Sequence, residues 1–201
     1  MCKVICVTNR HLCSDDFIKH IKKVAASGVD AVILREKDMC EDDYTKLAKQ
    51  VMDMCNENNT LCIFHSFTKT ARKLKCEAIH LPMHLLRSLK ESERKAYKVL
   101  GASCHSVSEA IEAERLGCTY ITAGHVFATD CKKGLEPRGT AFLKSVCEAV
   151  NIPVYAIGGI DVSNVASVME CGASGVCIMS GLMKCVNPMD YTDDLKKGMK
   201  I

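Results

Sequence analysis

Several features that mark common functional classes are missing from this sequence of 201 residues. It has no tryptophan and only 5% aromatic residues, and its basic residues are not interleaved with aromatic ones, so nucleic-acid binding has little support. No apolar run approaches the roughly 20 residues needed to cross a bilayer, and the N-terminus lacks the layout of a signal peptide. We therefore expect a cytoplasmic protein with neither a nucleic-acid nor a membrane partner.

Motifs for metal and dinucleotide binding are missing as well. The 14 cysteines include no Cys-x-x-Cys pair, and a zinc site needs about four convergent ligands, so we expect no metal site. Cys6, Cys62 and Cys177 fall inside apolar runs, where cysteine behaves as a small hydrophobic residue rather than as half of a disulfide. No Gly-x-Gly-x-x-Gly follows the first expected strand, which argues against an open dinucleotide-binding sheet.

What the chain does contain is a regular alternation of short apolar runs with amphipathic segments. The apolar runs, which we expect to be strands, span 3–8, 30–34, 60–64, 78–81, 99–103, 119–123, 153–157 and 175–179. Segments with helical spacing lie between them, among them 17–25, which follows an N-cap signal at 14–16, and 89–97. Eight such units over 1–201 predict a single α/β domain, a (β/α)8 TIM barrel, with an open doubly wound sheet as the alternative.

Polar or glycine residues follow most of these strands. Because the carboxyl ends of barrel strands share one face, we expect that face to carry the site. The candidates are Arg35 and Lys37, His65, His84, Ser103 and His105, His125 with Thr129 and Lys132, Gly158 and Gly159, and Ser180 and Gly181. Each alone has a structural explanation too, since a lone histidine at a strand end is more often a hydrogen-bonded group than a catalyst.

The glycines after the last two expected strands favour a phosphate site. Segments 158–159 and 180–181 fall in adjacent loops, where barrels bind phosphate through backbone N–H groups that glycine leaves accessible, although glycines also end strands without a ligand. Arg35 can fork two hydrogen bonds to an anionic group, with Lys37 as a second charge. These two residues either hold the other end of a substrate or pair with the neighbouring acidic residues.

Five segments, in order and over essentially the whole chain, resemble the thiamine phosphate synthase superfamily. They are 34–37, 100–106, 124–139, 153–160 and 176–181. The resemblance implies a (β/α)8 barrel that acts on a phosphorylated thiazole small molecule in thiamine biosynthesis. The superfamily has two branches: a synthase that joins hydroxymethylpyrimidine diphosphate to thiazole phosphate, and a tautomerase that aromatises a thiazole carboxylate phosphate. Barrels of this size often form homodimers, although no segment identifies an interface.

Departures from the synthase pattern favour the tautomerase branch. Where synthases carry Asn-Asp and a second Asp for magnesium, this chain has His-Ser at 65–66 and Pro-Met-His at 82–84. We therefore expect no cofactor, with magnesium needed only if the chain is a synthase. The Gly-His-Val-Phe at 124–127 resembles tautomerases, which implies that His125 is the acid–base of a proton shift within the thiazole.

These patterns together predict a thiazole tautomerase-like isomerase of thiamine biosynthesis. His125 is the expected catalytic residue, and the expected substrate- or phosphate-binding residues are Arg35, Lys37, His65, Ser103, Thr129, Lys132, Gly158, Gly159, Ser180 and Gly181. One alternative is thiamine phosphate synthase, a transferase that magnesium-dependent diphosphate release would distinguish. The other is a non-catalytic regulatory protein that binds thiazole phosphate or thiamine phosphate, and that binds its ligand equally well without His125.

Overall fold

The apolar runs of the sequence form eight parallel strands that close into a barrel in a computed structural model, which describes residues 3–200. The strands are β1 (Lys3–Val7), β2 (Ala31–Leu34), β3 (Leu61–His65), β4 (Ala78–Pro82), β5 (Val99–Cys104), β6 (Tyr120–Gly124), β7 (Val154–Ile157) and β8 (Gly175–Ile178). They follow one another round the barrel in sequence order, and β8 pairs with β1. This arrangement confirms the predicted TIM barrel and excludes the open sheet.

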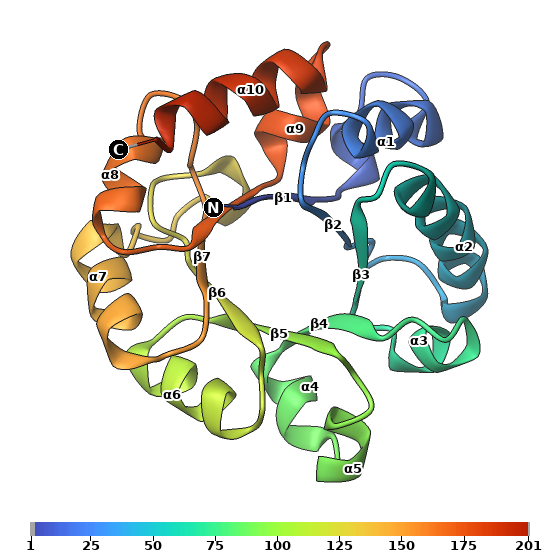
Figure 1. Cartoon of the computed structure of the whole chain (residues 1–201), viewed down its shortest axis with the longest axis horizontal. Coiled ribbons are helices and arrows are strands. Elements are labelled where there is room, and N and C mark those ends of the chain that lie inside the picture. Colours follow the sequence, from blue (N-terminus) through green and yellow to red (C-terminus); the bar gives the residue numbers. More distant parts are fainter. Residues whose placement is uncertain (1–2, 201) are drawn as a thin grey trace.

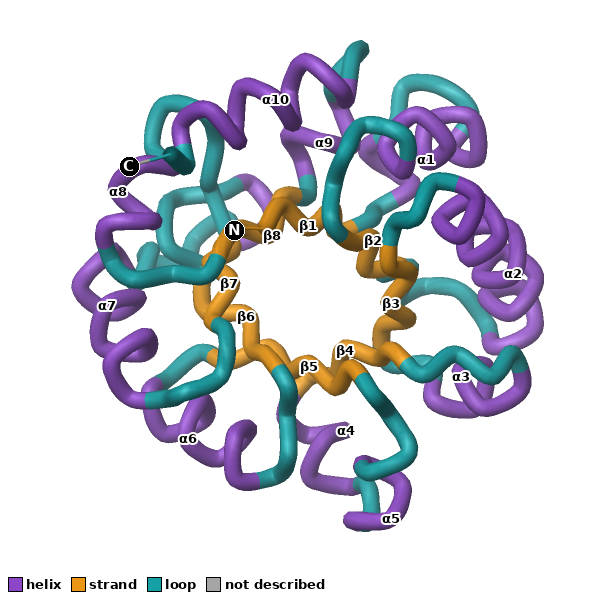
Figure 2. The backbone as a smooth tube through the Cα atoms, in the orientation of Figure 1, coloured by secondary structure: helices purple, strands orange, loops and turns teal. Residues whose placement is uncertain are grey.

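Helices surround the ring of strands on its outside (Figures 1 and 2). They are α1 (Phe17–Ala25), α2 (Glu41–Glu57), α3 (Thr68–Lys73), α4 (Met83–Ser88), α5 (Glu91–Arg94), α6 (Val107–Arg115), α7 (Gly139–Ala149), α8 (Val165–Glu170), α9 (Ser180–Lys184) and α10 (Pro188–Gly198), with short 3-10 helices at Arg10–Leu12 and Asp130–Lys132. The side chain of Asp16 caps α1 by accepting the Lys19 N–H. No helix formed by residues 3–200 has both the length and the apolar character that a bilayer crossing requires.

The connection between β4 and β5 differs from the prediction of one helical stretch over 89–97. Helix α4 begins directly after the strand, because Pro82 adopts the extended conformation that suits the residue before a helix. Within 89–97 only the single turn of α5 is helical. As a consequence His84 lies on α4 with its side chain exposed, rather than in a loop above the barrel.

Side chains alternate along each strand between two apolar layers. On β1, Ile5 and Val7 point into the barrel interior, whereas Val4 and Cys6 pack against the surrounding helices. The cysteines among residues 3–200 are free, and Cys6 and Cys177 are buried in these layers, as expected for small hydrophobic residues. Because the interior is packed with side chains, a ligand has room only at an end of the barrel.

Candidate active site

Every second residue of a strand points into the barrel, and at the carboxyl ends of the strands these inward residues are polar instead of apolar. On β2 the inward Ile33 is followed two residues later by Arg35, and on β3 the inward Ile63 is followed by His65. Arg35, His65 and Ser103 line a cavity of about 220 Å³ whose walls come from the ends of the barrel strands. The period-2 pattern therefore aims these side chains into the barrel mouth.

The structure gathers almost all of the predicted site residues around this cavity. Its lining includes Arg35, Lys37, His65, Ser103, His105, His125, Thr129, Lys132, Gly158, Gly159 and Ser180. Gly181 instead lines an adjoining, more open cavity of about 680 Å³, which shares Thr129, Lys132, Gly159 and Ser180 with the first. A Cβ on Gly181 would lie 2.1 Å from the Tyr191 hydroxyl, so the missing side chain there serves helix packing.

His80 was not among the predicted site residues; it lies on β4 inside the barrel and is only 2% exposed. One ring nitrogen lies 2.9 Å from the Tyr120 hydroxyl and the other 2.8 Å from Oγ of Ser103. A usable signal was present: His80 alternates with the apolar Ile79 and Leu81, so the strand period places it on the opposite, inward face.

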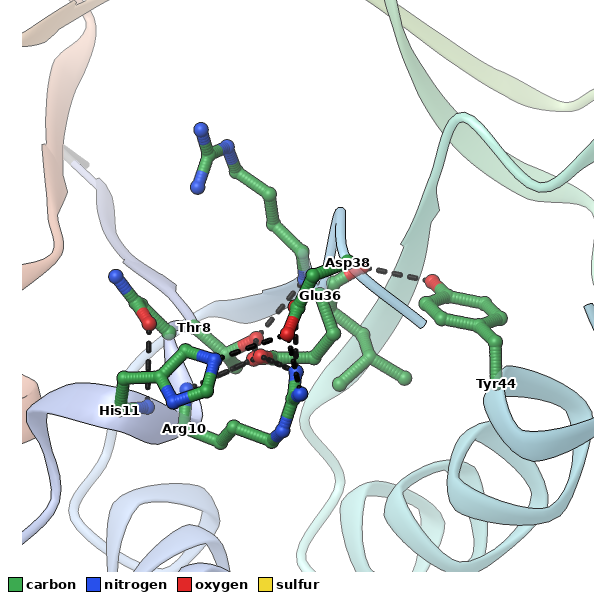
Figure 3. Close-up of polar contacts among 9 residues, drawn as sticks. Thr8, Arg10, His11, Glu36, Asp38 and Tyr44 are labelled. Carbon is green, nitrogen blue, oxygen red and sulfur yellow. Dashed lines mark hydrogen bonds and ion pairs between the residues drawn. The ribbon is translucent and has the colours of Figure 1, made fainter. Parts of the chain in front are cut away.

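The acidic residues that follow β2 are paired with Arg10 rather than with Arg35 or Lys37 (Figure 3). The Glu36 carboxylate is 2% exposed and accepts hydrogen bonds from the Thr8 hydroxyl at 2.6 Å and from the Arg10 backbone N–H at 3.1 Å. The Arg10 guanidinium lies 3.2 Å from the same carboxylate and also donates to Asp38. The surface-pair interpretation of Arg35 and Lys37 is therefore wrong, and both charges remain available to the cavity.

Three cationic side chains share this cavity without a carboxylate. Arg35, Lys37 and Lys132 line it, and none of the lining residues is Asp or Glu. Burial lowers the pKa of Arg35, and burial followed by the charges of Arg35 and Lys132 lowers the pKa of Lys37. Because neighbouring cations lower the pKa of Lys37, a polyanionic ligand would stabilise the charged form of this residue.

The glycine pair after β7 is required by close packing and leaves free backbone donors beside the cavity. Gly158 and Gly159 have φ values of +102° and +66°, and a Cβ on Gly158 would lie 2.3 Å from Cβ of His125. Neither the Gly159 N–H nor the Ser180 N–H donates to an acceptor within residues 3–200. Free N–H groups from the loop after β7 and from the first residue of α9 are donors that a phosphate accepts from.

Four histidines line the cavity: His65 and His80 from β3 and β4, and His105 and His125 beside the 125–139 loop. Burial is the main cause that lowers the pKa of His65 to about 2 and that of His80 to about 3, so both are neutral near pH 7. Nδ1 of His105 lies 2.8 Å from the Gly124 carbonyl oxygen, and Nε2 of His125 lies 3.4 Å from the Leu135 carbonyl oxygen. The second contact connects the start of the loop to its middle.

A magnesium ion of the kind that the synthase pattern implies does not fit these donors. Magnesium prefers carboxylate and other oxygen ligands in octahedral geometry, and the 220 Å³ cavity offers no carboxylate. Within residues 3–200, no three His, Cys, Asp or Glu side chains converge as a metal-binding group. The cavity's own charges are cationic and repel a divalent cation.

Comparison with known proteins identifies relatives over nearly the full chain. A family model described as thiamine monophosphate synthase matches residues 4–182. The chain is 33% identical over 184 residues to the thiamine-phosphate synthase of Fusobacterium nucleatum, covering 90% of this chain and 89% of that protein. It superposes on the thiamine phosphate pyrophosphorylase of Pyrococcus furiosus with a TM-score of 0.85 at 26% identity, covering 98% of this chain and 95% of the other.

These relatives contradict the predicted isomerase, because one is named thiamine-phosphate synthase, a transferase, and the other thiamine phosphate pyrophosphorylase. The prediction depended on the 124–127 segment and on the absence of the synthase carboxylates at 65–66 and 82–84. The structure explains the 124–127 segment by packing: a Cβ on Gly124 would lie 2.1 Å from the Ile157 carbonyl oxygen, and Val126 is fully buried. A short match with a packing explanation and the departures in two loops do not outweigh similarity along the whole barrel. The chain belongs to the thiamine monophosphate synthase family.

Proposed function

We propose that the chain is a transferase of the thiamine-phosphate synthase kind, which joins a pyrimidine diphosphate to a thiazole phosphate at the barrel mouth. The names of the relatives support this reaction type. The observation that carries the proposal is the presence of two anion-binding regions in one cavity, the cations at 35, 37 and 132 and the free N–H groups of Gly159 and Ser180. Two anionic regions match two substrates that carry a diphosphate and a phosphate.

The two regions have different tasks in this reaction. The bond between the pyrimidine methylene carbon and the diphosphate oxygen breaks, and the diphosphate leaves with the electron pair. Arg35, Lys37 and Lys132 stabilise the charge that develops on it. Arg35 is half-buried, which strengthens its interaction, whereas Lys37 and Lys132 are exposed. The thiazole, held through its phosphate by the N–H groups of Gly159 and Ser180, supplies the electron pair of the new bond.

His125 has a different role in this reaction from the one first predicted. The transfer needs no proton shift within the thiazole, so no acid–base is assigned to it. His125 lines the cavity and is 8% exposed, and its contact with Leu135 holds the basic 125–139 loop beside the cationic region. We assign it to substrate contact and loop positioning.

The test is synthesis of thiamine phosphate from the two substrates, measured by mass spectrometry. Arg35→Ala removes a charge that faces the diphosphate, and we expect kcat/KM to fall about 100-fold, since a hydrogen bond to a charged group contributes about 1.5–3 kcal/mol. Lys144→Ala is the control, because Lys144 is exposed on α7 and does not line the cavity. Absence of product from the wild type would overturn the transferase, and ligand binding without turnover would indicate a binding protein.

A further inference from the structure

A chain of hydrogen bonds crosses three neighbouring strands inside the barrel and ends at the cavity. The Tyr120 hydroxyl on β6 lies 2.9 Å from Nδ1 of His80 on β4, and Nε2 of the same ring lies 2.8 Å from Oγ of Ser103 on β5. Tyr120 and His80 are 4% and 2% exposed, whereas Ser103 is half-buried. His80 and Ser103 both line the cavity, and Ser103 is the more accessible of the two to a ligand at the barrel mouth.

Strand register and one glycine bring these side chains together. His80 pairs with Gly101 across β4 and β5, and Gly101 pairs with Tyr120 across β5 and β6, so the three residues lie at one level of the barrel. A Cβ on Gly101 would lie 2.1 Å from Cζ of Tyr120. The tyrosine ring therefore occupies the space that a side chain at 101 would fill, and it reaches across β5 to His80.

The directions of the hydrogen bonds follow from the need of buried donors for partners. Burial lowers the pKa of His80 to about 3 and raises the pKa of Tyr120, so the imidazole is neutral and the phenol keeps its proton. Within residues 3–200, Nδ1 of His80 is the acceptor available to the Tyr120 hydroxyl. Because buried donors are rarely left unpaired, Tyr120 donates to Nδ1, and the ring then donates its Nε2–H to Oγ of Ser103.

We propose that Tyr120 and His80 are positioning residues that hold Ser103 as a hydrogen-bond donor toward the cavity. With its oxygen accepting from His80, the serine has its own hydrogen to offer to a ligand. The ligand atom opposite Ser103 is therefore an acceptor. Arg35 lines the same cavity, so an oxygen of the phosphorylated substrate satisfies both residues. The identity of this acceptor rests on the proposed function, whereas the donor-to-acceptor direction from Tyr120 through His80 to Ser103 does not.

The direction of the two hydrogen bonds of His80 is tested by 15N NMR of the histidine rings, without substrate. In the wild type we expect His80 to carry its proton on Nε2 and to show an unprotonated Nδ1. Tyr120→Phe removes the donor and should abolish this preference. Tyr155→Phe is the matched control, because that ring packs against Tyr120 at a centroid distance of 5.6 Å, but its hydroxyl is not a partner in the hydrogen bonds of His80. A wild-type ring protonated on Nδ1 would overturn the proposal.

The effect on Ser103 is tested by a double-mutant cycle. Tyr120→Phe and Ser103→Ala should each lower kcat/KM about tenfold, as expected for one lost hydrogen bond of about 1.4 kcal/mol. If Tyr120 acts through Ser103, the double variant is no worse than Ser103→Ala. Multiplicative losses would refute the positioning role. If the wild type does not turn over, the proposed function fails by itself, and the same cycle is measured on thiamine phosphate affinity by calorimetry.

Discussion

The Thr8 hydroxyl donates to Oε1 of Glu36 over 2.6 Å, and the same Thr8 oxygen accepts the backbone N–H of Arg35 at 2.9 Å. One threonine at the end of β1 thus contacts both residues that follow β2. Glu36 in turn accepts the backbone N–H of Arg10. The segment that carries the cavity's arginine is therefore anchored by a buried carboxylate that points away from the cavity.

Glu36→Gln should weaken this anchor. The neutral amide keeps the size of the side chain but weakens its charge-assisted bonds to Thr8 and Arg10, so we expect a loss of about 2 kcal/mol of unfolding free energy. The measurement is urea unfolding, together with the KM for the diphosphate substrate, which should rise as Arg35 loses its support. Asp38→Asn is the control: this carboxylate is exposed, so the unfolding midpoint should stay unchanged. Equal effects of the two variants would contradict the anchor.

Stability should decrease in mild acid because of His65 and His80. Their pKa values are lowered to about 2 and about 3, chiefly by burial, whereas an unfolded histidine binds its proton near pH 6.5. Between these limits the unfolded state binds more protons, so this contribution to stability is complete above pH 6.5 and is lost as the pH falls toward 3. The expected slope is about 1.4 kcal/mol per pH unit for each histidine. Urea unfolding from pH 7.5 to 4.5 should show a shallower slope in His80→Gln, and an unchanged slope would count against the buried neutral ring.

Gly158→Ala should destabilise the barrel mouth. Its new Cβ would lie 2.3 Å from Cβ of His125, at a φ of +102°, so we expect a loss of about 3 kcal/mol from overpacking and backbone strain. Gly134→Ala separates the two causes, because Gly134 has a φ of +85° but no atom within 4 Å of the new Cβ. Strain alone should cost about 1 kcal/mol there. Thermal unfolding of both variants checks the difference, and matching losses would show that packing against His125 is unimportant.

Magnesium alone should not bind in the cavity, since its lining offers cations and no carboxylate. We expect millimolar MgCl2 to leave the melting temperature of the ligand-free protein unchanged and to give no binding heat in calorimetry. Inorganic diphosphate, by contrast, should raise the melting temperature through Arg35, Lys37 and Lys132. Saturable magnesium binding to the free protein would show that oxygen ligands outside this cavity can complete a site.

The sequence was sufficient for the barrel and for most of the site because both depend on local periodicity. Apolar runs of strand length alternating with amphipathic segments are visible in residue order, and the residues just after each run necessarily meet at one face. Arg35, His65 and Ser103 were placed at the cavity on that basis. The same local reasoning used the 124–127 segment to predict an isomerase, whereas the structure explains the segment by its packing against β7.

Which side chains become partners was decided only by the tertiary structure. Glu36 pairs with Thr8 and Arg10 rather than with its sequence neighbours, across a separation of 28 residues to Thr8, and His80 meets Tyr120 across 40 residues. These contacts depend on the register between strands and on a missing side chain at Gly101, which no local pattern reports. The sequence by itself therefore determined the barrel and the location of its site. Closure of the barrel decided which charged side chains line the cavity and which groups donate hydrogen bonds there. The physical reason is that the register between strands sets which residues, distant in sequence, lie side by side.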